Sequence, residues 1–229
     1  MTELTQNIIE LTRSAGADLI GVADPHLFSE SSYEGRDPRD IHPNIAAILL
    51  IGVMIPKGAI VPLPKGRAEY TNTLMAATAT LRVISFSLAR YLERLGYLAT
   101  ISPSEGSEFG YWYADKTTYM ANFSMKYAAY LAGLGNYGKN HLFLSSQYGS
   151  RVRFMAILTD APLKPGTRTQ EFINENCDEC SACIRACPVG AIKSDGTISR
   201  EVCASYMFEE LGGLRCGMCI HACPLANMR

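Results

Sequence analysis

"CDECSACIRACP", from Cys177 to Pro188, places four cysteines within eleven residues. A second group, "CGMCIHACP", runs from Cys216 to Pro224 and, with Cys203, completes the eight cysteines of the 229-residue chain. A fold stapled by disulfides would spread its bridges more widely, and disulfides are rare in the cytosol. Thiols gathered at one end of the chain therefore predict a metal-binding region.

The spacing of the first group is C-x2-C-x2-C-x3-C-P, the run of bacterial ferredoxins with two [4Fe–4S] clusters. In such proteins the fourth cysteine of a run binds the other cluster. The second group lacks its first cysteine, and Cys203 can fill that place. We therefore predict two sets of cluster ligands. The first ligand set is Cys177, Cys180, Cys183 and Cys223, and the second ligand set is Cys187, Cys203, Cys216 and Cys219.

Two structural zinc ions are the alternative, because thiolates bind zinc readily. Zinc sites rarely use a crossed run that ends in proline, which favours the clusters. His221 lies between two of the cysteines. Because eight thiols already complete both sets, we expect His221 at the surface or beside a ligand.

The residues before the cysteines have the composition of a packed domain, since 48% of the chain is apolar and 19% is charged. Apolar periodicity predicts helices over 3–15, 70–95 and 118–132 and a buried strand over 45–55. Further strands are predicted for "GADLIGVAD", "YLATI", "HLFLS" and "RVRFMAILT". We predict an α+β domain over 1–165 and a ferredoxin-like domain over 166–229.

Charge and hydropathy argue against two classes of partner. The formal net charge of −1 offers no electrostatic case for nucleic acid. The longest apolar run, Ile45–Ile55, has eleven residues, too few to cross a bilayer, and the amino terminus lacks the features of a signal peptide. We expect a cytoplasmic monomer or homodimer with no membrane or nucleic-acid partner.

"GLGNYG", from Gly133 to Gly138, matches the G-x-G-x-x-G fingerprint of dinucleotide-binding folds. The fingerprint requires a strand before the glycines and a helix after them, whereas here a predicted helix precedes them and a strand follows. A helix C-cap is the plain alternative. Three glycines in six residues exceed the needs of a cap and indicate a backbone that closely approaches a flat or phosphate-bearing ligand.

The run from Tyr127 to Pro224, including "GLGNYGKNHLFLSSQYGSRVRFMAILTDAPL" and both cysteine groups, resembles the epoxyqueuosine reductases and, more distantly, the reductive dehalogenases. The resemblance implies a nitroreductase-like, corrinoid-binding α+β domain joined to a bacterial-ferredoxin-like module. In that family, electrons pass from the clusters to the cobalt of cobalamin. A low-potential donor of the ferredoxin or flavodoxin type is the implied partner.

The resemblance also implies which residues line the corrinoid. Backbone of the glycine segment would approach the corrin, and the two polar residues after it would contact the amide or phosphate tail. The implied contacts are Gly133, Leu134, Gly135, Tyr137, Gly138, Lys139, Asn140, Pro188, Val189, Gly190, Ala191 and Ile192.

Two departures from the epoxyqueuosine reductases concern the reaction. Ser102 stands where those enzymes carry an aspartate proton donor, and serine is a poor general acid. The chain also ends at Arg229, without the carboxyl-terminal extension expected of a tRNA-acting enzyme. We therefore expect a corrinoid-dependent iron–sulfur reductase that does not act on epoxyqueuosine. An electron-transfer protein without a corrinoid and a flavin-dependent reductase are the alternatives.

The loop over 104–119 offers substitute proton donors. The candidates are Glu105, Glu108, Tyr111, Tyr113 and Tyr119, together with Asp115. For any one of them, the alternative is a packing cluster in which the aromatic side chains cover an apolar face.

Overall fold

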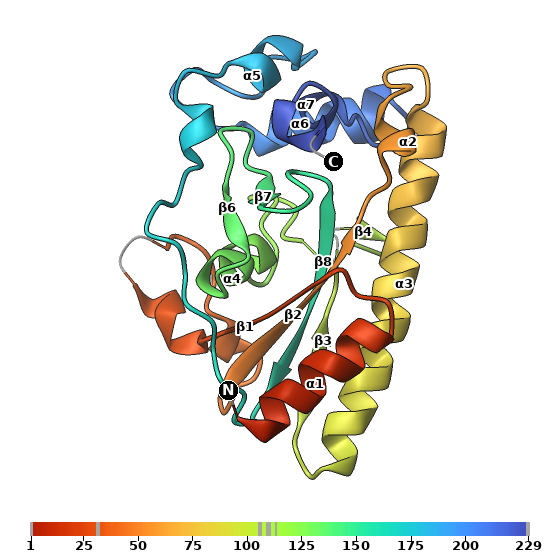
Figure 1. Ribbon diagram of the computed structural model, residues 1–229. Coiled ribbons are helices and arrows are strands. Elements are labelled where there is room, and N and C mark those ends of the chain that lie inside the picture. Colours follow the sequence, from red (N-terminus) through yellow and green to blue (C-terminus); the bar gives the residue numbers. More distant parts are fainter. Residues whose placement is uncertain (1, 31–32, 105–106, 109–110, 113, 228–229) are drawn as a thin grey trace. The chain divides into compact units, whose positions relative to one another are not determined.

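The computed structural model describes residues 2–30, 33–104, 107–108, 111–112 and 114–227 (Figure 1). The chain forms two compact units, each assembled from three separate segments. Unit 1 consists of Met1–Val53, Thr78–Leu134 and Arg153–Thr169, and unit 2 of Met54–Ala77, Gly135–Val152 and Gln170–Arg229. Two segments that precede the cysteines in the sequence therefore group with them.

The elements that lie wholly or mainly in unit 1 are α1 (Glu3–Ser14), β1 (Leu19–Ala23), η1 (Pro25–Ser29), η2 (Pro38–Asp40), β2 (Ala47–Met54), α3 (Arg67–Arg94), β3 (Ala99–Ser102), β4 (Ser107–Glu108), β5 (Tyr111–Trp112), α4 (Met125–Leu131) and β8 (Val152–Thr159).

A four-stranded sheet with the order β1-β2-β8-β3 forms the centre of unit 1. β1 pairs antiparallel with β2, and β3 pairs antiparallel with β8. Figure 1 shows α1 in front of this sheet, and both α1 and α4 contact β1. The side chains of β2 are buried from Ala47 to Val53, which explains why the predicted strand is an uninterrupted apolar run.

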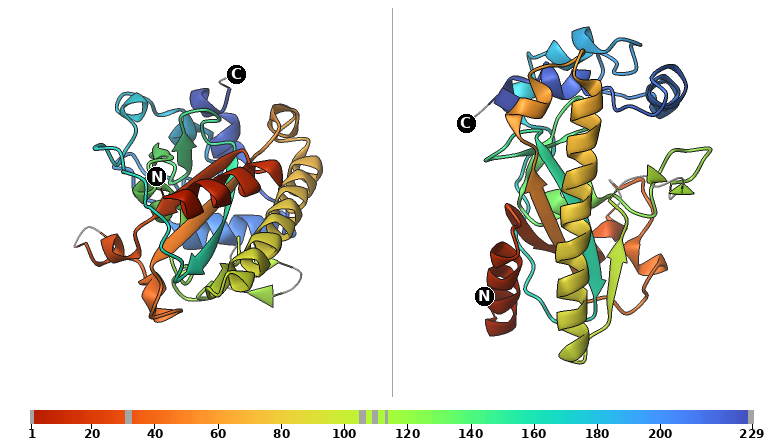
Figure 2. Two further views of the ribbon diagram at one scale, coloured as in Figure 1. Left: turned by 60° about the horizontal axis from the view of Figure 1, so that its bottom comes forward. Right: turned by 90° about the vertical axis from the view of Figure 1, so that its right-hand side faces the viewer.

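Helix boundaries in unit 1 follow capping groups. The Thr2 hydroxyl accepts the N–H of Thr5, so α1 begins where the sequence predicts. α4 begins at Met125, seven residues later than predicted, because the Ser124 hydroxyl caps it by accepting the N–H of Tyr127. Figure 2 shows α3 along its full length, close to the predicted helix over 70–95.

The elements of unit 2 are α2 (Lys57–Ile60), β6 (Gly135–Tyr137), β7 (Phe143–Ser145), η3 (Glu175–Cys177), α5 (Ala182–Ala186), α6 (Arg200–Ser205), η4 (Tyr206–Glu210), α7 (Met218–His221) and η5 (Pro224–Asn227).

An apolar core joins the three segments of unit 2. Ile55, Leu63 and Tyr70 from the first segment pack with Leu144 of the hairpin β6–β7 and Ile220 of α7. Arg151 is 4% exposed; its Nε donates to the Ala226 carbonyl at 2.7 Å and its guanidinium also donates to the Ile55 carbonyl at 2.8 Å. The residues around the second cysteine group are thereby held to distant parts of the sequence.

Within the part of the chain that the structure describes, no helix combines the length and apolar character needed to cross a bilayer.

Candidate metal centre

All eight cysteines lie in unit 2, and none of them forms a disulfide. Short helical turns carry many of them: Cys177 ends η3, Cys183 lies in α5, Cys203 in α6 and Cys219 in α7. Cys183 and Cys223 are buried, and the others are partly exposed.

The thiols of the first ligand set lie near one another. Burial raises the pKa of Cys177, and the neighbouring thiols of Cys223 and Cys180 raise it further. Burial likewise raises the pKa of Cys183, followed by the effect of Cys177 and Cys180. Like-charge repulsion of this kind requires groups that are close in space.

The thiols of the second ligand set also lie near one another. Burial raises the pKa of Cys203, with Cys216 and Cys187 adding to it. Burial raises the pKa of Cys219 to about 12, and Cys203 and Cys216 are its strongest thiol neighbours. The thiols of each set match in number the four ligands of one [4Fe–4S] cluster, although Cys219 is also coupled to Cys183 of the first set. Among the described residues, no three His, Cys, Asp or Glu side chains converge closely enough to hold a single metal ion. The division of the individual cysteines between the clusters stays a prediction.

One sulfur atom of the second set accepts a backbone hydrogen bond: the N–H of Ala191 donates to Cys187 Sγ at 3.2 Å. In the first set, burial raises the pKa of the Cys177 thiol and the backbone N–H of Lys139 opposes that rise. Such N–H···S contacts orient thiolate ligands and stabilise negative charge on a cluster.

His221 Nδ1 donates to the carbonyl oxygen of Ile60 in α2 at 2.9 Å. The ring is therefore anchored to the backbone of α2, and its role beside the cluster ligands stays a prediction.

The glycine segment has two structural roles. Gly133, at φ +75°, ends α4: its N–H donates to the Tyr130 carbonyl and the N–H of Leu134 donates to the Ala129 carbonyl, a Schellman arrangement. Gly135, at φ +152°, opens the hairpin β6–β7, and a Cβ atom there would lie 2.1 Å from the carbonyl oxygen of Leu144. The space beside Gly135 is therefore filled by the protein's own backbone rather than left for a ligand.

The predicted corrinoid contacts divide by accessibility. Six are buried: Gly135, Tyr137, Gly138, Asn140, Ala191 and Ile192. The other six, which retain exposed surface, are Gly133, Leu134, Lys139, Pro188, Val189 and Gly190. Gly190 has φ +59°, and no atom lies within 4 Å of a Cβ placed on it. Pro188, Val189 and Gly190 thus form a continuous stretch of unit 2 that retains exposed surface.

Four of the six predicted proton donors lie outside the described residues or are described only as backbone. Glu105 and Tyr113 lie outside the described residues, and Glu108 and Tyr111 are described only as backbone of β4 and β5. Tyr119 is half-buried, with φ +55°.

Asp115 and Ser102 have defined surroundings. Asp115 Oδ1 accepts the N–H groups of Thr118 and Thr117 at 2.8 and 2.9 Å, which lowers the pKa of its carboxyl. Asp115 is therefore ionised at neutral pH and poorly suited to donate a proton. Ser102 ends β3, opposite Ala156, and is buried.

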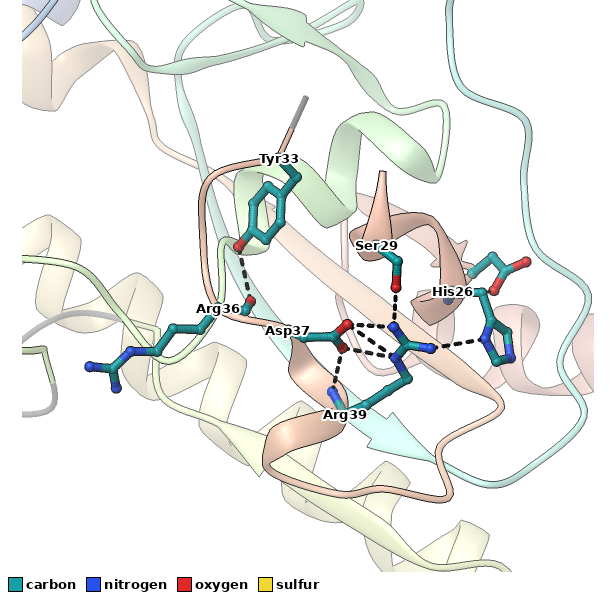
Figure 3. A network of polar contacts seen from close by, with 7 residues as sticks. His26, Ser29, Tyr33, Arg36, Asp37 and Arg39 are labelled. Atoms are coloured by element: carbon teal, nitrogen blue, oxygen red, sulfur yellow. Dashed lines mark hydrogen bonds and ion pairs between the residues drawn. The ribbon is translucent and has the colours of Figure 1, made fainter. Parts of the chain in front are cut away.

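A polar network in unit 1 was not predicted (Figure 3). The guanidinium of Arg39 donates to the Asp37 carboxylate, to the Ser29 hydroxyl and, at 3.2 Å, to His26 Nδ1. Two Asp-Pro pairs are the sequence signal for this arrangement, because an aspartate cap followed by proline starts a helical turn. Asp37 caps η2 in this way, and its pKa is lowered chiefly by its hydrogen bonds from Arg39.

The same loop is held to α4 by Tyr33. Its hydroxyl accepts the N–H of Ser124 at 3.0 Å and donates to the Arg36 carbonyl at 3.2 Å, and its ring stacks on Tyr127 at 4.5 Å. Through these contacts Tyr33 packs against α4 within unit 1.

Residues 176–227 match the family model of a 4Fe-4S dicluster domain. The chain carries two [4Fe–4S] clusters. The dicluster domain covers both cysteine groups, so the predicted iron–sulfur cofactors are confirmed.

The chain is similar to epoxyqueuosine reductases in sequence. It is 24% identical to the enzyme of Bacillus subtilis over 259 residues, which cover 97% of this chain and 64% of the relative. It is 34% identical to the enzyme of Listeria monocytogenes over 76 residues, or 33% of this chain and 19% of the relative. The chain thus spans less than two thirds of these relatives.

The fold is shared with two groups of reductases. An epoxyqueuosine reductase solved with an epoxyqueuosine-modified tRNA stem loop superposes with a TM-score of 0.68 and 22% identity, covering 98% of this chain and 65% of the other. A catabolic reductive dehalogenase superposes with a TM-score of 0.73 and 18% identity, covering 96% and 31%. The predicted resemblance and the α+β fold with a carboxyl-terminal dicluster domain are confirmed.

Two expectations from the sequence find no support in these comparisons. The relatives are named epoxyqueuosine reductases, so the exclusion of that activity on the basis of Ser102 and the chain end is unsupported. A fold neighbour binds a tRNA stem loop, so a net charge near zero was a poor ground for excluding nucleic acid.

Proposed function

We propose that this protein is an iron–sulfur reductase that passes electrons from its two clusters to a bound corrinoid. The observation that carries the proposal is the contact between the glycine hairpin and the segment of the first ligand set: Lys139 Nζ donates to the carbonyl of Asp178, the residue next to Cys177, at 2.7 Å. The segment assigned to the corrinoid by family resemblance therefore touches the segment assigned to a cluster. A reductive dehalogenase with the same fold, whose structure suggests a mechanism for B12-dependent dehalogenation, supports the same cofactor.

A corrinoid, when bound, supplies a metal centre that accepts electrons one at a time and reduces an organic substrate. Pro188, Val189 and Gly190 are the residues of unit 2 best placed to hold its edge, because their surface is open. They follow Cys187 directly, so a molecule held there lies close to the second ligand set. A short separation between the bound corrinoid and the cluster of the second ligand set favours electron transfer from that cluster.

A second candidate function is reduction of epoxyqueuosine in tRNA. It is favoured by the Bacillus subtilis relative, whose similarity extends over 97% of this chain. A structure from that organism has a catalytic aspartate loop swung out of the active site. Ser102, in the corresponding place by resemblance, cannot supply a carboxylic proton. A proton for this reaction would have to come from another group, such as the hydroxyl of Tyr119 or a group in contact with the bound substrate.

The proposal is tested with anaerobically reconstituted protein. Two clusters require about eight iron and about eight sulfide per chain. Cobalamin and flavin mononucleotide are then titrated separately, and binding is followed by absorbance. Saturable cobalamin binding, followed by its reduction when a low-potential ferredoxin or flavodoxin is added, is the expected result.

Other outcomes separate the alternatives. Flavin binding without cobalamin binding would replace the proposal with a flavin-dependent reductase. Full clusters with neither ligand would favour a plain electron-transfer protein, whereas zinc without sulfide would overturn the cluster assignment. A further reaction with epoxyqueuosine-containing tRNA tests the second candidate directly, since queuosine either forms at an enzymatic rate or does not.

A further inference from the structure

The tip of the hairpin β6–β7 is formed by Lys139 and Asn140. The N–H of Gly138 donates to the Leu142 carbonyl at 2.9 Å, and the N–H of His141 donates back to the Gly138 carbonyl at 2.9 Å. His141 has φ +56°, the left-handed conformation that closes such a turn. The turn fixes the direction in which the backbone N–H of Lys139 points.

The hairpin is bonded to the segment that leads into Cys177. The N–H of Tyr137 donates to the Phe172 carbonyl, and the N–H of Asn174 donates to the Tyr137 carbonyl, both at 2.8 Å. The rings of Tyr137 and Phe172 stack with centroids 4.5 Å apart. These sheet-like contacts hold the hairpin tip in a constant position beside the first cysteine.

Lys139 meets the first ligand set in two ways. Its ammonium donates to the carbonyl of Asp178, the residue next to Cys177, at 2.7 Å. Burial raises the pKa of the Cys177 thiol, and the backbone N–H and the charge of Lys139 both oppose that rise. The partner of the ammonium is a neutral carbonyl, so this hydrogen bond is not an ion pair. Lys139 as a whole is partly exposed and this hydrogen bond lies at the exposed surface, so water screens part of the charge.

We propose that Lys139 is a positioning residue that raises the reduction potential of the cluster held by the first ligand set. The inference rests on the dicluster domain and on the predicted ligand sets. Reduction adds one electron from the external donor to the cluster and transfers no proton, so the cluster becomes more negative by one charge. A nearby cation stabilises the reduced state more than the oxidised state, which moves the potential in the positive direction.

Lys193 provides a matched control in unit 2. Its Nζ also donates to a backbone carbonyl, that of Gly190, at 2.8 Å. Asp195 lies close enough for the Lys193 charge to lower the pKa of its carboxyl, after the larger effects of its hydrogen bonds from Thr197. Because that carboxylate offsets the ammonium, Lys193→Met removes the same formal charge with a smaller change in local potential.

The test measures both cluster midpoint potentials by redox titration monitored by electron paramagnetic resonance, with no corrinoid present. The proteins are the wild type, Lys139→Met, Lys139→Arg and Lys193→Met, each with its iron and sulfide content determined. Lys139→Met is expected to move one midpoint to a more negative value and leave the other in place. Lys139→Arg is expected to retain the wild-type value, and Lys193→Met is expected to leave that midpoint unchanged.

A Lys139→Met protein with full iron and sulfide and both midpoints at wild-type values would overturn the proposal. An equal shift of the same midpoint in Lys193→Met would also overturn it, because a general charge effect would then suffice. If Lys139→Met lost iron, Lys139→Gln, which keeps a hydrogen-bond donor without charge, would be titrated under the same criterion. Because the assay contains no corrinoid, its outcome does not depend on corrinoid binding. Failure of this inference can therefore be told apart from failure of the proposed function.

Discussion

Replacing Gly135 with alanine tests whether the glycine segment is shaped by its own packing or by a ligand. The new Cβ would lie 2.1 Å from the Leu144 carbonyl oxygen and 3.0 Å from both the Leu144 carbonyl carbon and Ser145 Cα. Carbon atoms in contact prefer separations of about 3.5–4.0 Å, so the paired strand must move by roughly 1 Å or more. Both neighbouring residues meet the new atom with backbone, which cannot rotate away as a side chain can.

The cost has two parts. A positive φ costs a non-glycine residue about 1–2 kcal/mol, and an unpaired buried peptide group costs about 1–3 kcal/mol. We therefore expect Gly135→Ala to lower the free energy of unfolding by about 2–5 kcal/mol, a large share of the roughly 5–15 kcal/mol typical of a domain. Gly196→Ala is the matched control, because Gly196 has φ +84° but no atom within 4 Å of the place that a Cβ would occupy. The control should lose only about 1–2 kcal/mol.

The assay compares urea unfolding of the three proteins under anaerobic conditions, alongside cobalamin titration of the folded samples. Gly135→Ala is expected to unfold at a clearly lower urea concentration than Gly196→Ala. The packing argument would be refuted if Gly135→Ala unfolded at the wild-type urea concentration and lost only cobalamin affinity. The glycine would then face the ligand, as the sequence alone suggests.

Three further predictions concern other parts of the chain. Cys203→Ala should retain about half of the wild-type iron and sulfide, since it removes a ligand from one cluster only; loss of neither cluster would contradict the predicted ligand sets. Arg151→Met should lower the free energy of unfolding by about 2–4 kcal/mol because two buried carbonyls lose their charged donor, whereas the exposed Arg185→Met should unfold much as the wild type does. Asp37→Asn should destabilise the protein at neutral pH. The pKa of Asp37 is lowered in the folded state, so its contribution is complete above its usual pKa of about 3.9 and is lost as the pH falls through the lowered value. The difference in thermal midpoint between wild type and Asp37→Asn should therefore shrink below about pH 4; a constant difference from about pH 7 to about pH 2 would show that the hydrogen bond with Arg39 is not responsible.

The sequence alone determined the parts of this protein that depend on short separations along the chain. Cysteines separated by two residues can bind the same cluster, and the fourth cysteine of such a run binds the other one, so their spacing indicated two [4Fe–4S] clusters. The long helix α3 and the buried strand β2 were predictable for a similar reason, because apolar periodicity reports which face of a local element is covered.

Only the tertiary structure decided what surrounds those elements. The carbonyl of Leu144 behind Gly135, and the placement of Lys139 beside Cys177, depend on strand pairing and on contacts between residues far apart in sequence. The grouping of Met54–Ala77 with the cysteines depends on a shared apolar core. A glycine-rich stretch has the same letters whether its open side meets a ligand or another strand. Which of the two occurs is determined by long-range hydrogen bonds and packing, and no local pattern encodes that choice.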